Sequence, residues 1–117
     1  MVAARPETIV NSNFIELNEA NFHREVLSAL QPVLVEFWAG WSEASKVMAP
    51  LLETVAKDDA IPVKIVRVNV EHHENLTDQY GVRAVPTLLL FNQDRVRDQI
   101  VGQTAAQAVR ESLMRLI

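Results

Sequence analysis

The chain of 117 residues contains no cysteine, and this absence excludes more chemistry than any other feature of its composition. Without a thiol the protein forms no disulfide, holds no thiolate-ligated metal and performs no thiol catalysis. Basic residues are also in the minority, because 11 lysines and arginines stand against 15 acidic residues and leave a net charge of −4. Since the basic residues form no cluster, nothing in the charge pattern favours nucleic acid or an anionic membrane as a partner. No segment is apolar over the length that a membrane-spanning helix needs.

The remaining composition predicts a single domain. Apolar residues make up 49% of the chain, which is enough for one hydrophobic core, and the chain is too short for two domains. We expect a polar N-terminal extension over residues 1–12 and one domain over residues 13–117. The extension lacks the charged start and apolar run of a secretory signal, so the expected location is the cytoplasm. The sequence suggests no cofactor, and we expect a monomer.

Strands and helices are predicted to alternate along the chain. The most apolar run contains a single charged residue, Glu36, as expected of a strand that is buried on both faces of a partly parallel sheet. Asn18 is predicted to cap the first helix, and Thr104 with Gln107 forms a predicted capping box for the last helix. Predicted strands cover residues 14–17, 33–38, 63–70, 88–91 and 95–101, the last two as a hairpin, and predicted helices cover 18–30, 42–57, 76–80 and 104–117.

The segment 37–46 carries the most informative pattern, Phe-Trp-Ala-Gly-Trp-Ser-Glu-Ala-Ser-Lys. It resembles the redox loop of thioredoxins, with Ser42 and Ser45 at the two cysteine positions. In that family the first cysteine attacks disulfides as a thiolate, which the N-terminus of the following helix stabilises. A serine hydroxyl is too weak an acid to replace a thiolate at neutral pH. The resemblance therefore implies the site without its redox chemistry.

Other segments carry the same resemblance in the same order. Residues 33–39 resemble the central strand that enters the loop, and Pro50 resembles the proline within the long helix that follows. Residues 80–87 resemble the segment with a cis-proline, here Pro86, and Gly102 resembles the late glycine of the family. The resemblance implies an α/β thioredoxin fold, with a central mixed sheet of about five strands flanked by about four helices.

Glu36 is the titratable residue that most needs an explanation, because an acid in an apolar strand requires a partner or a raised pKa. It resembles the buried aspartate that exchanges protons with the resolving cysteine of thioredoxins, and Arg67 matches the lysine that accompanies that aspartate. The pair is either a relic of catalysis or a structural ion pair, which persists because loss of one partner would leave a buried charge. With no thiol to serve, we favour the structural role.

The resemblance also implies a groove for a protein chain. In the family, an exposed tryptophan, the residue before the cis-proline and the late glycine form an apolar trough in which a substrate lies extended. Glu43 and Ala44 replace the usual glycine and proline of the loop and place a charge at the rim of this trough. Strand-like pairing with a protein or peptide client is therefore expected. The matching groove residues here are Trp41, Val85, Pro86, Val101 and Gly102.

Two functions remain open at this point. If the redox chemistry was lost naturally, the chain is a protein- or peptide-binding module that acts as a chaperone or adaptor through the former substrate groove. If the serines replace native cysteines, it is the inactive form of a thioredoxin-type protein-disulfide oxidoreductase of cell redox homeostasis. All of positions 42–45 differ from the common motif. We favour natural loss, because a laboratory trap would leave the two spacer residues unchanged.

Serine catalysis and metal binding find less support in the residues. Neither serine lies in a Gly-x-Ser-x-Gly or Ser-x-x-Lys motif, and a helix cap explains Ser42 without catalysis. Glu71, His72, His73 and Glu74 are residue types that bind zinc, but adjacent side chains diverge and no third ligand is evident. We interpret residues 71–74 as a solvated loop.

Overall fold

The computed structural model describes residues 14–116. The predicted N-terminal extension, residues 1–12, and its boundary with the domain lie outside the described residues. The described chain forms, in order, β1 (Ile15–Glu16), η1 (His23–Leu27), β2 (Val33–Trp38), α2 (Glu43–Ala56), β3 (Lys64–Asn69), α3 (Glu74–Gln79), β4 (Thr87–Asn92), β5 (Arg95–Val101) and α4 (Ala106–Met114).

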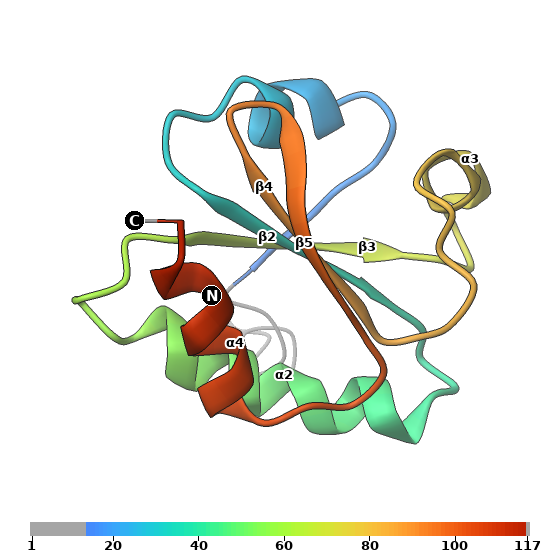
Figure 1. Cartoon of the computed structure of the whole chain (residues 1–117). Helices are drawn as coiled ribbons and strands as arrows, with labels where there is room; N and C mark the ends of the chain where they lie inside the picture. The colour runs from blue at the N-terminus through green and yellow to red at the C-terminus, as the bar shows by residue number, and fades with distance from the viewer. Residues whose placement is uncertain (1–13, 117) are drawn as a thin grey trace, which may run out of the picture.

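A five-stranded mixed sheet in the order β1-β3-β2-β4-β5 forms the centre of the molecule (Figure 1). β1, β3 and β2 run parallel, whereas β4 is antiparallel to β2 and β5 is antiparallel to β4. β2 lies in the middle of the sheet, and five of its six residues are buried because helices cover both faces. The predicted α/β fold with a central mixed sheet is confirmed.

Two hydrophobic clusters lie on the two faces of this sheet. On one face, η1 and α3 pack on the strands through a cluster that contains Phe22, Val26, Val35, Phe37, Leu76 and Phe91. On the other face, α2 and α4 lie side by side and bury a cluster that contains Leu34, Met48, Leu52, Leu88, Val109 and Leu113 (Figure 1). Because α2 is held by this second cluster, the loop between β2 and α2 has a fixed position at the end of the sheet.

The first helix is much shorter than predicted. In place of a helix over residues 18–30, the chain forms turns followed by the five-residue π-helical segment η1. Asn18 caps the turn before this segment rather than the helix itself, because its Oδ1 accepts a hydrogen bond from the N–H of Asn21 at 3.0 Å. The N–H of Ser28 donates to the carbonyl of His23 and closes the segment. Leu30 is 95% exposed, so a further turn would have buried no apolar side chain there.

The last two connections differ from the predictions in their details. The predicted hairpin is confirmed, and its turn consists of Gln93 and Asp94, which both have positive φ values of 53° and 67°. The predicted cap of the last helix is wrong, because α4 begins one residue later, with Ala105 at the N-cap and no side-chain cap. Gln107 is then the second helical residue, and its amide donates to Glu111 at 3.2 Å instead of to the helix start.

Candidate functional site

The two serines of the loop between β2 and α2 have structural contacts at the start of the helix. Ser42 is the N-cap of α2, and its Oγ accepts a hydrogen bond from the N–H of Ser45 at 3.1 Å. Ser45 Oγ in turn accepts a hydrogen bond from the N–H of Ala39 at 3.3 Å. Both serine side chains are buried. Ser42 therefore has the capping role that the sequence predicts, and neither hydroxyl is presented to a substrate.

Glu36 and Arg67 form a buried ion pair directly opposite each other in the ladder of β2 and β3, with Glu16 of β1 on the other side of Arg67. Arg67 Nε donates to Glu36 Oε1 at 2.9 Å, and Arg67 Nη1 lies 3.6 Å from Glu16 Oε2. Glu36 is 0% exposed, and its Oε2 has no hydrogen-bond partner among the described residues. Burial therefore raises the pKa of Glu36, and the charge of Arg67 offsets only part of this effect.

A cavity of about 350 Å³ connects the environment of the ion pair with that of the loop. Arg67 and Ser45 both line it, together with Trp38 and Lys46. Trp38 is half-buried, with the guanidinium carbon of Arg67 4.1 Å from its ring centroid and its Nε1 donating to Glu16 at 3.2 Å. Arg67 of the buried pair and the second serine therefore border the same cavity.

The predicted groove residue Trp41 projects from the loop with 67% of its surface exposed. It lines a pocket of about 150 Å³ together with Val85, and the peptide bond between Val85 and Pro86 is cis, as the resemblance implies. Val70 and Val82 add further apolar surface to this pocket. Sites for metabolite-sized ligands usually measure about 300–1,000 Å³, so this pocket has the size for one side chain of a polypeptide.

The other predicted groove residues are joined to the cis-proline through the backbone. Val101 is opposite Thr87 in the ladder of β4 and β5, and its side chain is 58% exposed. The N–H of Gly102 donates to the carbonyl of Pro86 at 2.7 Å, with Gly102 at a φ of +86°, which residues with a side chain rarely adopt. The N–H and C=O of Val85 have no hydrogen-bond partner among the described residues.

Two residues at this site were not assigned to it from the sequence. Glu71 Oε1 accepts a hydrogen bond from the N–H of Gly40 at 3.2 Å and thereby holds the loop that carries Trp41. Arg83 lines the pocket beside Trp41. The signal for Glu71 was its place just after the predicted strand 63–70, at the same end of the sheet as the loop. The signal for Arg83 was its place two residues before Val85.

The segment 71–74 makes structural contacts. Glu71 is bonded to the loop, and His73 Nδ1 lies 3.1 Å from Glu19 Oε1. The rings of His72 and His73 are nearly perpendicular to each other, with centroids 6.2 Å apart. Within residues 14–116, no group of three His, Asp or Glu side chains is placed to hold a metal ion.

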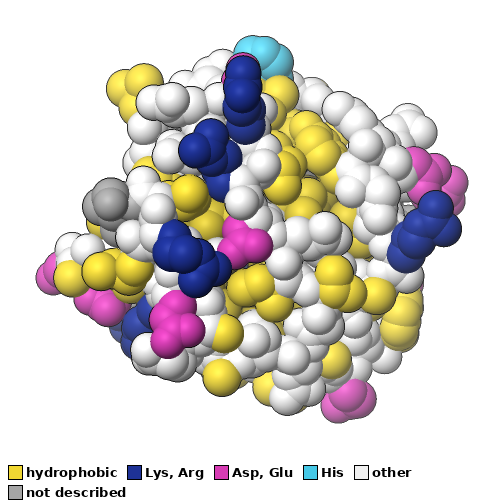
Figure 2. Space-filling view, viewed as in Figure 1, with side chains coloured by type: hydrophobic (Ala, Val, Ile, Leu, Met, Phe, Trp, Pro, Cys, Tyr) yellow, Lys and Arg dark blue, Asp and Glu magenta, His cyan; other side chains and the backbone are white. Residues whose placement is uncertain are grey.

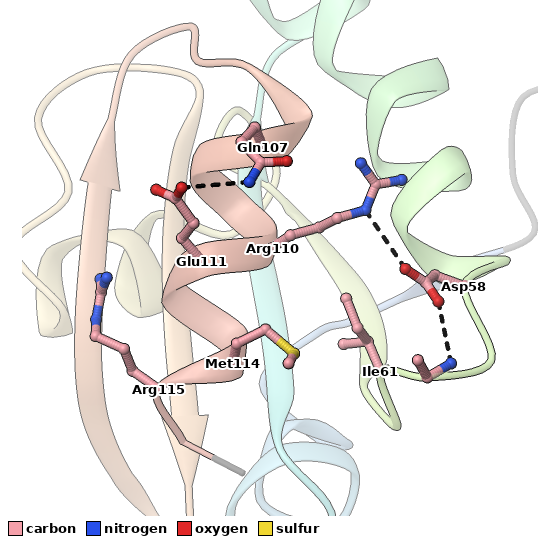
Figure 3. A pocket seen from close by; sticks show the side chains of 8 residues that line it. Asp58, Ile61, Gln107, Arg110, Glu111, Met114 and Arg115 are labelled. Atoms are coloured by element: carbon pink, nitrogen blue, oxygen red, sulfur yellow. Dashed lines mark hydrogen bonds and ion pairs between the residues drawn. The ribbon is translucent and has the colours of Figure 1, made fainter.

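A larger cavity, of about 520 Å³, lies between α4 and the segment that follows α2 (Figure 3). Apolar side chains such as Ile61 line it together with charged ones, and Arg110 reaches across to Asp58 at 3.5 Å. Arg115 is paired with Asp98 of β5 at 3.1 Å. On the face seen in Figure 2, acidic side chains likewise lie beside basic ones near α4. Because charges of both signs are paired here, this cavity has no clear preference for an anion or a cation.

The comparisons with known proteins agree with this geometry. A family model described as thioredoxin matches residues 13–115. The thioredoxin of Buchnera aphidicola is 36% identical over 102 residues, which cover 87% of this chain and 94% of that protein. The thioredoxin of Pseudomonas aeruginosa is 36% identical and thioredoxin C-2 of Corynebacterium nephridii is 40% identical, each over 93 residues that cover 80% of this chain and 86% of the relative. Among the described residues, no helix is both long and apolar enough to cross a membrane.

Proposed function

Because the chain belongs to the thioredoxin family and contains no cysteine, we propose that it binds polypeptide segments without exchanging disulfides. The client lies extended in the groove beside Trp41, next to the cis bond between Val85 and Pro86. The protein acts as a chaperone or adaptor that holds a client rather than reducing it.

One observation carries this proposal, namely a residue with an unpaired backbone N–H and C=O next to an exposed aromatic side chain. The carbonyls on either side of Val85 are occupied, since Ala84 accepts from the hydroxyl of Thr87 and Pro86 accepts from Gly102. The N–H and C=O of Val85 itself are free among the described residues, and a free donor and acceptor on one residue are what an added strand requires. Trp41 offers a large apolar surface beside this point, which a client side chain can cover.

The size of the groove sets the strength of binding. A client that fills one pocket of about 150 Å³ and pairs with the backbone of one residue buries far less surface than a stable protein–protein interface of about 1,200–2,000 Å². Association must also offset the lost freedom of the client, so the dissociation constant is on the order of micromolar or weaker. Such an affinity suits a protein that releases its client without a chemical step.

A second candidate function is that of a protein-disulfide oxidoreductase in which Ser42 and Ser45 replace native cysteines. The cavity behind the loop favours it, because position 45 borders the same space as Arg67, and Arg67 contacts the carboxylate of Glu36. A proton acceptor therefore remains near the place of a resolving thiol. The codons for positions 42 and 45 in the native gene distinguish the two functions: serine codons support binding, and cysteine codons support redox catalysis.

A titration followed by NMR tests the binding function. Reduced and carboxymethylated α-lactalbumin, an unfolded client without free thiols, is added to protein labelled with nitrogen-15. The amide signals of Trp41, Val85 and Gly102 should shift first, and Trp41→Ala should weaken binding about tenfold or more, as expected for a central aromatic contact. The control is Leu30→Ala, which removes another exposed apolar side chain, one that lies outside the groove. Shifts confined to α4, or binding that survives Trp41→Ala unchanged, would contradict the proposal.

A further inference from the structure

Among residues 14–116, Arg83 is the only charged side chain that lines the pocket beside Trp41. It is exposed, and no carboxylate within residues 14–116 is paired with it. The nearby cation Lys46 differs, because its Nζ lies 3.1 Å from Glu43 at the rim of the loop. The pocket therefore presents one unpaired positive charge, although the chain as a whole carries a net charge of −4.

The rest of the pocket is shaped for an apolar side chain. Its volume is about 150 Å³, and Thr77, the only other polar side chain in its lining among the described residues, donates its hydroxyl to the carbonyl of His73. Its apolar lining consists of Trp41, Val70, Val82, Ala84 and Val85. A free inorganic anion would gain little here, because a single exposed cation binds it weakly in water. A carboxylate is retained only when the same molecule also anchors an apolar group in the pocket.

We infer that the groove selects extended segments in which an acidic side chain lies two positions from an apolar one, and that Arg83 binds the acidic side chain. This inference rests on the proposed function and names the class of client. Side chains two positions apart on a strand point to the same side and are separated by about 6.6 Å. The long side chain of Arg83 spans this separation from the edge of the pocket. Val85 pairs with the backbone of the client, the pocket takes the apolar side chain, and Arg83 takes the carboxylate.

Three capped peptides test this selection. They share the sequence Ser-Thr-Leu-Thr-X-Ser, in which X lies two positions after Leu and is aspartate, asparagine or lysine, and their affinities are measured by the change in tryptophan fluorescence. An exposed ion pair contributes a factor of about two to five in affinity. The aspartate peptide should therefore bind about two- to fivefold more tightly than the asparagine peptide, and the lysine peptide should bind more weakly than both.

Two variants of equal net charge test whether Arg83 causes the preference for aspartate. Arg83→Gln should abolish the preference for aspartate and leave the affinity for the asparagine peptide within twofold of its original value. Arg95→Gln is the matched control, because Arg95 is also exposed and lies opposite Asn92, at the end of β5 remote from Val101. This control should keep the preference. In about 1 M salt, where the screening length is about 3 Å, the preference should disappear while the asparagine peptide still binds.

The outcomes separate this inference from the proposed function. Equal binding of the three peptides, or a preference that survives Arg83→Gln, overturns the inference, and so does an equal loss of preference in Arg95→Gln. If binding without preference still depends on Trp41, the proposed function stands and only the selection by Arg83 is wrong. If none of the peptides binds at millimolar concentration, the proposed function fails and this inference fails with it.

Discussion

Replacement of Arg67 by methionine should destabilise the protein strongly at neutral pH. In the structure, Arg67 Nε donates to Glu36 Oε1 at 2.9 Å, and Glu36 Oε2 already lacks a partner among the described residues. Arg67→Met would leave this carboxylate buried and unpaired. Loss of one partner from a buried ion pair costs about 3–5 kcal/mol, a large part of the 5–15 kcal/mol by which small domains are typically stable.

The double variant Glu36→Leu with Arg67→Met should recover this loss. It removes both buried charges and keeps a similar volume, and such replacements are neutral or stabilising by about 1–4 kcal/mol. The contact of Arg67 with Glu16 at 3.6 Å is lost in both variants and contributes about 0–1 kcal/mol, because Glu16 is partly exposed. The free energy of unfolding in urea, followed by far-UV circular dichroism, gives both values.

The pH dependence of stability provides a second test of the same argument. Burial raises the pKa of Glu36 above its ordinary value of 4.5, so the folded protein holds this proton more tightly than the unfolded chain. The stability linked to this proton is present below pH 4.5 and is lost as the pH rises through the folded pKa. Without Arg67 that pKa rises further, so Arg67→Met should cost less at pH 5 than at pH 8. A cost that is equal at both pH values, or a double variant as unstable as the single one, would refute the reasoning.

Three further predictions concern the loop. Ser42→Ala should lower the free energy of unfolding by about 1 kcal/mol through loss of the cap, whereas Ser42→Gly should cost only a few tenths, as measured by urea unfolding. The chain should not accelerate the reduction of insulin by dithiothreitol above a protein-free control. The double variant Ser42→Cys with Ser45→Cys should form a disulfide and accelerate this reduction. A variant that forms the disulfide but does not turn over would show that the surroundings no longer support catalysis. Glu71→Ala should speed hydrogen exchange at the Gly40 amide and, by loosening the loop, weaken client binding about two- to fivefold. Glu71→Gln keeps an acceptor for this amide and should leave both the exchange rate and the affinity unchanged. Unchanged exchange in Glu71→Ala would show that this contact does not hold the loop.

Much of the fold was predictable because its signals are local. The apolar run around Glu36 predicted a central strand, and β2 is that strand. Ser42 at the start of an apolar helical pattern predicted an N-cap, and its Oγ makes the capping bond. The pairing of Glu36 with Arg67 was inferred from the resemblance, and the ladder of β2 and β3 sets them opposite each other.

The errors have physical causes that a single sequence does not show. The helix over residues 18–30 depended on Asn18 as its cap, but Asn18 caps a turn that precedes η1, and Leu30 at the predicted end is 95% exposed. Thr104 and Gln107 have the spacing of a capping box, yet α4 begins one residue later and this shifts Gln107 out of the required position. The roles of Glu71 and Arg83 depend on contacts between segments that are distant in the sequence, such as the 31 positions between Gly40 and Glu71.

The binding that we propose does not depend on redox chemistry. Thiol chemistry needs sulfur at positions 42 and 45. The proposed groove depends instead on Trp41, on the unpaired N–H and C=O of Val85 and on the hydrogen bond from Gly102 to Pro86. None of these groove features involves a side chain at position 42 or 45. Serine at position 42 also supplies an oxygen that accepts a hydrogen bond from the N–H of Ser45, so the start of α2 remains capped. Binding at this groove, as proposed, therefore requires no thiol, whereas the covalent step of disulfide exchange does.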